Sequence, residues 1–438
     1  MRKEKMPLPL TAVYRVHEQQ VDLKTYQLFR LNQLLVFVCQ MNGFYRDKLK
    51  EVRLPLGSLQ ELGSIPFTTK QELIEDQAKY LPYGRNLTYP VSSYIRYHQT
   101  SGTTGKPLKV LDTQESWGWW QDCWLEVLRT CGVTEEDRLF LAFSFGPFIG
   151  FWSAYEAAKK AGALIIPGGG QTSVERLYSM LDNQATVLLC TPSYALHLAE
   201  VAKEHGLDIQ SSHVQKIIVA GEPGGSIPSV RRQIESAWGA KLHDHVGMTE
   251  IGAYGYSCPV RNGIHVNESQ FIAEVVDPDT LQPVKEGKTG ELVLTNFDRY
   301  GFPLIRYRTG DMVNNTDIPC GCGNLHRFLP GGILGRCDDM VIVRGVNIFP
   351  QSIEAVIREF PEAAEFRIVY FTREEMNQVK VQVEAPGFLV PKLEKRLRNR
   401  IRLRIDVETV DPGFLPRFEM KSRRVVDERV KKYKRRER

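Results

Sequence analysis

The chain has 438 residues, of which 42% are hydrophobic and 25% are charged, and its net charge is +5. This length and apolar content exclude a disordered chain and predict two or more globular domains. No apolar run approaches the roughly 18 residues of a membrane span, and residues 1–10 lack the apolar stretch of a secretion signal. We therefore expect a cytoplasmic protein without a membrane partner.

The positive charge lies almost entirely in the tail RVKKYKRRER at residues 429–438, and the rest of the chain is nearly neutral. A charge run at a chain end is typical of a solvated tail. Contact with RNA or with an acidic membrane is the alternative, although we do not expect nucleic acid as a partner.

Residues 97–110, YHQTSGTTGKPLKV, read as a strand, a polar loop and a strand, because both flanks alternate apolar and polar residues. The loop combines hydroxyl donors, glycines that let backbone amides approach a ligand, and a cation, which suits a polyphosphate. Its residues are Ser101, Gly102, Thr103, Thr104, Gly105 and Lys106. A flexible hairpin tip would use the same residue types. A Walker P-loop is excluded, because Gly102 and Gly105 are too close together and Pro107 replaces the metal-binding hydroxyl.

From residue 138 to residue 246, strand-like runs such as RLFLAFSF, TVLLCT and VQKIIVAG alternate with helix-like segments. This rhythm predicts a parallel sheet with helices on both faces and with function in the loops at the strand ends. In the preceding helix, Trp117, Trp120, Trp124 and Leu128 recur at helical spacing, which predicts a stripe that faces the core.

Past residue 251 the pattern turns to β runs punctuated by glycine and proline, and after Gly335 it changes again. Residues 339–438 read as two short strands, a helix from Gln351, two longer strands, a charged helix from residue 391 and a last strand. We therefore predict an α/β fold with a large N-terminal domain of parallel sheets flanked by helices, a β-rich subdomain, and a small α+β C-terminal domain.

Four metal-ligating side chains stand in the β-rich region at C-x6-H and C-x-C spacing: Cys258, His265, Cys320 and Cys322. Soft and borderline ligands of this kind suit a closed, tetrahedral structural zinc site. Free buried thiols are the alternative, and His326 is a substitute ligand if His265 points away.

Five segments in this order resemble the adenylate-forming enzymes, and most closely their phenylacetate-CoA ligase branch. They are TSGTTGKP (100–107), AGEP (220–223) with HDHVGMTE (243–250), LIRYRTGD (304–311), GRCDDMVIVRGVNIFPQSIE (335–354) and LPRFEMKSRRVVD (415–427). The resemblance covers nearly the whole chain and is weakest in the first 90 residues. Some relatives carry zinc in the segments that hold the four ligands above, which favours zinc over free thiols.

The resemblance implies an AMP-forming acid–thiol ligase. Such an enzyme joins a carboxylate to ATP, releases pyrophosphate, and passes the acyl group from the adenylate to the thiol of coenzyme A. The loop at 101–106 would then hold the β and γ phosphates, and Glu250 would hold Mg²⁺ with Thr249 beside it at the phosphate. Taken alone, a glutamate after a threonine is an ordinary helix-start residue.

The other motif positions take their implied roles from the same resemblance. Asp311 accepts hydrogen bonds from the ribose hydroxyls and Arg336 donates to the same sugar, while Gly221, Glu222 and Pro223 form the loop on the adenine side. Without the other motifs, Asp311 would read as a turn residue.

The last two motifs imply a C-terminal domain that moves. Lys421 would bring positive charge to the α phosphate during adenylation, Asp338 would be the hinge residue, and Gly345 would line the coenzyme A tunnel. The implied domains are an N-terminal adenylation (AMP-binding) domain at 1–335, a hinge at 336–338, and a mobile C-terminal domain with a basic tail at 339–438. We also expect a homodimer.

The run FLAFSFGPFIGFW at 140–152 is rich in phenylalanine and ends a predicted central strand. Phe145, Phe148 and Ile149 could form the walls of a pocket for a flat aromatic acid, although core packing is the simpler explanation for most of these rings. We expect an aryl monocarboxylic acid as the substrate.

Two departures from the family pattern affect the expected activity. Val246 stands where the family usually has an aromatic residue that stacks on adenine, and Met420 replaces the glycine before the motif lysine. Two alternatives therefore stay open. One is an adenylating enzyme that passes the acyl group to an amine, a hydroxyl or a carrier-protein thiol, and the other is a catalytically weakened, zinc-stiffened binding protein.

Overall fold

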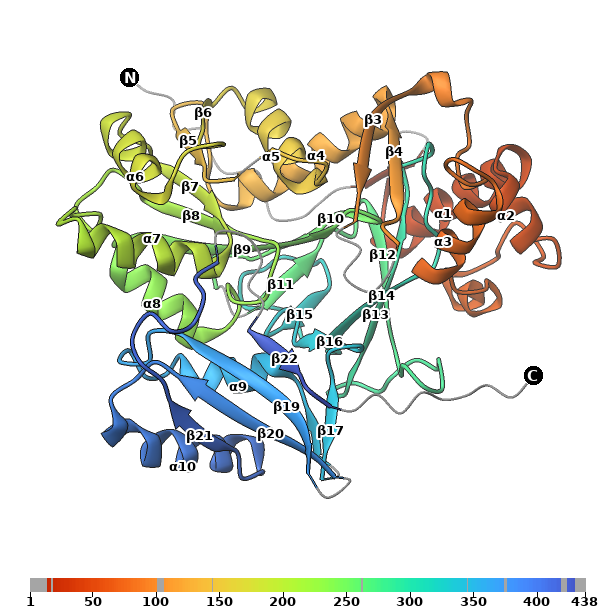
Figure 1. Ribbon diagram of the computed structural model, residues 1–438. Coiled ribbons are helices and arrows are strands. Elements are labelled where there is room, and N and C mark those ends of the chain that lie inside the picture. Colours follow the sequence, from red (N-terminus) through yellow and green to blue (C-terminus); the bar gives the residue numbers. More distant parts are fainter. Residues whose placement is uncertain are drawn as a thin grey trace.

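The computed structural model describes residues 14–16, 19–100, 106–143, 145–260, 263–344, 346–373, 376–418 and 424–429 (Figure 1). The N-terminal part forms β1 (Tyr14–Val16), β2 (Gln19–Val21), α1 (Leu23–Met41), α2 (Gly43–Lys48) and α3 (Lys70–Lys79). Each helix begins at a side-chain cap, which is Asp22 for α1, Asn42 for α2 and Thr69 for α3. Among the helices of the described ranges, none has the length and apolar character needed to cross a membrane.

Within the described residues, the largest sheet has eight strands in the order β15-β11-β10-β9-β8-β7-β5-β6. Their bounds are β5 (Arg138–Leu141), β6 (Leu164–Pro167), β7 (Val187–Cys190), β8 (Lys216–Val219), β9 (Lys241–Met248), β10 (Gly252–Tyr256), β11 (Gly263–Val266) and β15 (Phe328–Pro330). The strands from β6 to β9 are parallel, as the alternating pattern predicted. The strands from β9 to β15 are antiparallel and extend the sheet on one side.

Helices cover both faces of the parallel part, because successive strand residues point to opposite sides. Leu139 and Leu141 of β5 join one hydrophobic core and Phe140 between them joins another. The first core lies under α4 (Gln114–Thr130) and α5 (Ile149–Lys160), and the second under α6 (Ser173–Asp182), α7 (Pro192–Glu204) and α8 (Pro228–Trp238). Trp117, Trp120 and Trp124 of α4 are buried in the first core, which confirms the predicted stripe.

A second, antiparallel sheet forms the β-rich region and has the order β12-β13-β14-β16. Its strands are β12 (Phe271–Val276), β13 (Thr289–Asn296), β14 (Tyr307–Asn314) and β16 (Gly335–Arg336). A separate hairpin of β3 (Tyr94–Gln99) and β4 (Lys109–Thr113) contacts the loop after β13, where the Tyr94 hydroxyl donates to the carbonyl of Gly301 at 2.6 Å. Most β13 side chains are buried, so this sheet is packed on both faces rather than on one.

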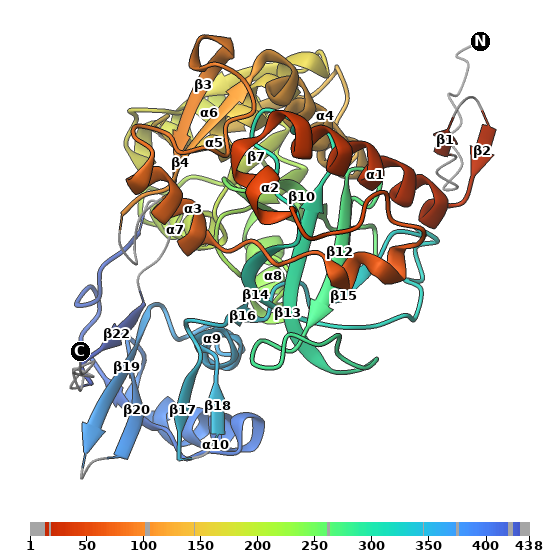
Figure 2. The ribbon, with the colours of Figure 1, turned by 90° about the vertical axis from the view of Figure 1, so that its right-hand side faces the viewer.

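The C-terminal region folds around its own core, which confirms the predicted small C-terminal domain of helices and strands. It comprises β17 (Val341–Val343), β18 (Val346–Ile348), α9 (Pro350–Ile357), β19 (Phe366–Arg373), β20 (Met376–Val383), α10 (Val390–Ile401), β21 (Asp406–Thr409) and β22 (Val425–Asp427). Its main sheet has the order β21-β20-β19-β22, and Ile353, Val381 and Leu393 lie in its core. In Figure 2 this region lies below the large domain.

The two regions touch through α8 and α9 and through the chain that follows β21. Ser229 Oγ of α8 donates to the carbonyl of Ala355 at 2.8 Å, and Gln233 Nε2 donates to the carbonyl of Arg358 at 2.9 Å. Arg417 pairs with Glu200 of α7 at 3.2 Å. These polar contacts connect the two regions, whose described residues share no apolar core.

Candidate nucleotide site

The predicted strand, loop and strand at 97–110 form the β3–β4 hairpin. At the end next to its connecting segment, the backbone amide of Thr100 donates to the carbonyl of Leu108, and the amide of Leu108 donates to Thr100 Oγ1, both at 3.0 Å. Ser101, Gly102, Thr103, Thr104 and Gly105 lie outside the described residues. Lys106, the first described residue after them, is exposed to solvent.

A buried arginine that sequence reasoning missed connects this hairpin to the predicted metal-binding turn. Arg299 donates from Nε and Nη2 to the two carboxylate oxygens of Asp112 on β4, at 2.8 and 2.7 Å. Its Nη1 donates to the carbonyls of Thr249 and Glu250, at 3.1 and 2.7 Å. Both side chains of the ion pair are fully buried. Arg299 therefore fixes the 249–250 turn next to β4, the strand that follows the predicted phosphate loop.

Glu250 is buried, with 5% of its side chain exposed, and pairs with Lys70 at 3.0 Å between Oε1 and Nζ. Lys70 is the first residue of α3, and sequence reasoning did not select it. The nearby Tyr307 is fully buried, and burial, followed by the negative charge of Glu250, raises its pKa well above the ordinary value. Glu250 thus lies in a dry environment where a cation is needed to balance its charge.

Asp311 and Arg336 face each other as direct partners on the adjacent strands β14 and β16. Arg336 Nη1 lies 3.3 Å from Asp311 Oδ1, and Arg336 Nε donates to Asp338 at 2.8 Å. Burial lowers the pKa of Arg336, but the carboxylates of Asp311 and Asp338 raise it by more than burial lowers it. The pKa therefore lies above its ordinary value. Tyr254 of β10 donates to Asp311 Oδ2 at 3.1 Å. Tyr254 is a third residue, after Arg299 and Lys70, that sequence reasoning missed.

The loop after β8 begins at Gly221, whose φ of +92° is a conformation that favours glycine. Glu222 accepts a hydrogen bond from the backbone amide of Ser193 at 2.8 Å and another from the Ser193 hydroxyl. Pro223 is half-buried beside it. These contacts hold the 221–223 loop against the first turn of α7.

Val246, on β9, is half-buried and packs against the first hydrophobic core. Two positions earlier, burial raises the pKa of Asp244 to about 6, although the hydroxyl of Ser226 donates to it at 2.6 Å. At position 246, β9 therefore presents an aliphatic side chain and not an aromatic ring on which a base could stack.

The aromatic run at 140–152 ends β5 and enters α5. Phe145 is half-buried and lies 4.8 Å from the ring of Trp152, and Phe148 is half-buried at the N-cap of α5. Ile149 is 3% exposed and belongs to the first core. Phe145 and Phe148 thus keep accessible surface, whereas Ile149 contributes its side chain to packing.

The four predicted metal ligands lie together, with all their ligand atoms within 4.8 Å of one another. Cys258 Sγ and Cys320 Sγ are 3.6 Å apart, and Cys322 Sγ is 3.4 Å from His265 Nε2. These separations fit four ligands around one zinc ion, given Zn–S and Zn–N bonds of about 2.3 and 2.0 Å. His265 Nδ1 lies 3.0 Å from the carbonyl of His326, which orients Nε2 toward the cluster. His326 Nδ1 instead lies 3.2 Å from the Tyr256 hydroxyl, so His265 is the better ligand.

Lys421 and Gly345 lie outside the described residues, as does Met420. Asp338 is the ion-pair partner of Arg336. It lies between β16 and β17, where the β-rich sheet ends and the C-terminal region begins.

Two family models match the chain. The model "AMP-binding enzyme" matches residues 93–296, and "AMP-binding enzyme C-terminal domain" matches residues 345–429. The phenylacetate-coenzyme A ligase of Thermus thermophilus is 32% identical over 92% of this chain and 96% of that protein. The phenylacetate-coenzyme A ligase of Pseudomonas putida is 29% identical over 93% of this chain and 94% of that protein. These matches confirm the family that the five motifs predicted.

A solved 2-hydroxyisobutyryl-CoA ligase is similar in structure and was captured in several states. In the postadenylation state with 2-HIB-AMP, it matches with a TM-score of 0.87 at 29% identity, over 92% of this chain and 89% of that one. In the thioesterification state with 2-HIB-AMP and CoA, it matches with a TM-score of 0.70 at 30% identity, over 93% and 90%. Since identity and coverage are almost equal, the difference shows that this chain is more similar in structure to that ligase in its postadenylation state than in its thioesterification state.

Proposed function

Since this chain belongs to the phenylacetate-CoA ligase family of adenylate-forming enzymes, we propose that it is an AMP-forming ligase that joins an aromatic carboxylic acid to coenzyme A. The acid's carboxylate attacks the α phosphorus of ATP and pyrophosphate leaves. The thiol of coenzyme A then attacks the acyl carbon and AMP leaves. The observation that carries the proposal is the arrangement of Glu250 and Asp311, two buried carboxylates that each have a cation beside them and stand at the family's motif positions.

Asp311 is the proposed ribose ligand. An ionised carboxylate can accept from two sugar hydroxyls, and Tyr254 and Arg336 hold this one in position from opposite oxygens. Arg336 keeps further donors for the same sugar. The loop at Gly221, Glu222 and Pro223 would contact adenine, with Val246 giving an apolar surface instead of a stacked ring.

Glu250 is the proposed magnesium ligand, because a carboxylate oxygen suits this hard cation. Magnesium would supply charge neutralisation of the phosphates. The chain's own groups would position them: the hydroxyls and amides of residues 101–105, Lys106, and Thr249 in the turn that Arg299 fixes.

The C-terminal region would supply Lys421 for adenylation and Gly345 for the coenzyme A tunnel. We propose domains at 1–335 and 339–438 with a hinge at 336–338 that includes Asp338. The two TM-scores against one ligase in two states, 0.87 and 0.70, support a domain that moves. The pairing of Asp338 with Arg336 places a charged contact at the proposed hinge.

A panel of carboxylic acids tests which acid is the substrate. Incubation with ATP, Mg²⁺, coenzyme A and phenylacetate, benzoate, 2-hydroxyisobutyrate or acetate, followed by mass detection of the thioester, should give the most product with an aryl acid. Phe145, Phe148 and Ile149 are the proposed pocket residues, and the accessible rings of the first two support this. Pyrophosphate release without thioester would instead favour transfer to an amine, a hydroxyl or a carrier-protein thiol. No conversion of ATP to AMP with any acid would favour the weakened binding protein.

A structural zinc ion in the Cys258, His265, Cys320 and Cys322 cluster is also proposed, and the geometry of the four ligand atoms supports it. It would tie the β10–β11 segment to the chain before β15. Elemental analysis should find one zinc per chain, and Cys322→Ser should lower both the zinc content and the melting temperature. A full-length protein without zinc and without a melting shift on chelation would contradict this site.

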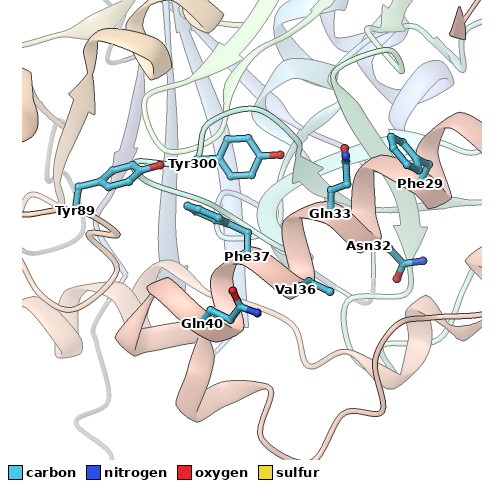
Figure 3. Close-up of a pocket in the computed structure, with 8 residues that line it drawn as sticks. All are labelled: Phe29, Asn32, Gln33, Val36, Phe37, Gln40, Tyr89 and Tyr300. Carbon is cyan, nitrogen blue, oxygen red and sulfur yellow. The ribbon is translucent and has the colours of Figure 1, made fainter. Parts of the chain in front are cut away.

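The homodimer and the cytoplasmic location stay predictions. A groove of about 650 Å³ on α1 offers an uncharged surface for self-association, lined by aromatic, amide and apolar side chains that include Val36, Phe37 and Tyr300 (Figure 3). Val36 is 43% exposed in it. Light scattering should give the mass of two chains for the wild type and of one chain for Val36→Glu.

A further inference from the structure

The ion pair between Lys70 and Glu250 joins parts of the chain that no single motif contains. Glu250 ends the HDHVGMTE segment, and Lys70 begins α3 in the N-terminal part. The Nζ–Oε1 distance is 3.0 Å, and the exposed fractions are 35% for the Lys70 side chain and 5% for that of Glu250. The lysine side chain thus reaches solvent, whereas the carboxylate is buried.

Backbone pairing, rather than the flexible lysine chain, sets this position. Thr68 forms a parallel bridge with Tyr307 of β14: its amide donates to the carbonyl of Arg306, and its carbonyl accepts from Arg308, both at 2.9 Å. The Thr68 hydroxyl donates to the carbonyl of Ile305 at 2.8 Å. Lys70 is therefore fixed at its backbone two residues from a bridge to the strand that also carries Asp311.

A buried arginine fixes the same segment from the other side. Arg306 donates to both oxygens of Glu274, at 2.9 and 2.7 Å, and to the carbonyl of Ile65 at 2.6 Å. Its guanidinium also lies over the ring of Phe67 at 3.9 Å. The segment from Ile65 to Lys70 is thus held to the β-rich sheet at several points, and α3 then begins at the Thr69 cap.

The ammonium group of Lys70 lies beside the Glu250 carboxylate, where a divalent cation would also have to bind. A buried carboxylate is unfavourable unless a cation is beside it. The ammonium already satisfies one oxygen of Glu250, and a second cation at the same carboxylate would be repelled by it. Mg²⁺ also dehydrates reluctantly and binds through carboxylates together with phosphates.

We propose that Lys70 is the resident counter-ion of Glu250 and keeps divalent cations off this carboxylate until ATP arrives. The inference rests on the proposed function, because it takes Glu250 as the magnesium ligand. When the nucleotide enters, its phosphates provide the negative charge that a second cation requires. The ammonium and the metal ion are then held together by the carboxylate and the phosphate oxygens, and the metal binds only as part of a nucleotide complex.

Manganese binding to the nucleotide-free protein tests this. Free Mn²⁺ is followed by its electron paramagnetic resonance signal in wild type and in Lys70→Met, Lys70→Gln and Lys70→Arg. Both neutral variants should bind Mn²⁺ tighter by on the order of tenfold, since the repulsion is removed, whereas Lys70→Arg should match wild type. The matched control is Lys216→Met. Lys216 also pairs with a buried carboxylate, that of Asp137, with 2.8 Å between Nζ and Oδ2, and this pair lies away from the nucleotide site. Lys216→Met should show no gain.

The double variant Lys70→Met with Glu250→Gln tests whether Mn²⁺ binds at Glu250. It should lose the increase in Mn²⁺ affinity that Lys70→Met alone shows. Equal Mn²⁺ affinity of wild type and both neutral variants would overturn the proposal, and so would the same gain in Lys70→Arg or in Lys216→Met. ATP-dependent Mn²⁺ binding, measured in the same samples, separates this failure from that of the proposed function. If wild type and Glu250→Gln bind Mn²⁺ equally with ATP present, Glu250 is not the metal ligand, and both this inference and the proposed role of Glu250 fail.

Discussion

Glu250 and Asp311 are two buried carboxylates in one candidate nucleotide site, and each has one cation and one tyrosine nearby. Lys70 lies 3.0 Å from Glu250, and Arg336 lies 3.3 Å from Asp311. The tyrosines are Tyr307 and Tyr254, and in both the burial and the neighbouring carboxylate raise the pKa well above its ordinary value. The two surroundings are therefore built from the same residue types.

The cations differ in how they are held. Arg336 is fixed by the pairing of β14 with β16 and by a second carboxylate, Asp338, and its planar fork keeps a set geometry. Lys70 reaches Glu250 with a single ammonium on a flexible stem, which can turn to another partner. This difference suits a permanent ribose ligand at Asp311 and an exchangeable cation site at Glu250.

The largest effect is expected on stability, from Arg299→Met. This change removes the hydrogen bonds from Arg299 to the 249–250 turn and does not touch the surroundings of Asp311. It also leaves Asp112 buried without its cation, which should lower the free energy of unfolding by about 3–5 kcal/mol. Urea unfolding measures it. Arg336→Met is the control on the Asp311 side, and it should cost less than about 1 kcal/mol, because the Arg336 side chain is 39% exposed. Equal losses would mean that the two carboxylates are supported alike.

Glu250→Gln should lower the rate of adenylate formation by about 100- to 1,000-fold, because it removes the proposed oxygen ligand of the metal that would neutralise the phosphates. Pyrophosphate release at saturating ATP measures this rate. The dissociation constant of ATP should change much less. A variant that adenylates at the wild-type rate would remove Glu250 from the mechanism.

Asp311→Asn should act mainly on ATP affinity. Loss of a charged acceptor for the ribose hydroxyls should weaken ATP binding by about 10- to 100-fold, with a smaller change in kcat. Isothermal titration calorimetry and the KM for ATP measure it. The comparison breaks if Asp311→Asn lowers kcat as much as Glu250→Gln does.

Tyr254→Phe should give the smallest effect, about threefold to tenfold weaker ATP binding, because one neutral hydrogen bond to Asp311 is lost while Arg336 stays. The matched control is Tyr256→Phe on the same strand, whose hydroxyl contacts His326 and Asn324 instead. Its ATP affinity should equal that of the wild type. A similar loss in both variants would point to a general weakening of β10.

Local patterns predicted much of the fold. The alternation of strand-like and helix-like runs gave the parallel sheet, and the helical spacing of Trp117, Trp120 and Trp124 gave the buried face of α4. The extra antiparallel strands β10, β11 and β15 of the large sheet were not predicted in this sheet, because their pairing depends on distant partners rather than on their own residues.

In the candidate site, too, some residues could be predicted from the sequence and others were found only in the structure. Asp311, Arg336 and Glu250 stand in motifs that together resemble one family, so the resemblance implied their roles without a structure, and the four proposed zinc ligands have a readable spacing. Arg299 could not be found in this manner, since a lone arginine reads as a solvated side chain and its carboxylate partner lies 187 positions away. Tyr254 reads as an ordinary strand residue until β10 is placed beside Asp311.

The sequence by itself determined the family, the order of the elements and the motif residues that would contact a nucleotide, because periodicity and short-range spacing are local properties of the chain. The tertiary structure alone decided which charges balance one another. Lys70 meets Glu250 only because Thr68 pairs with β14, and a contact of that kind arises from the closure of long loops, which leaves no signal in either segment.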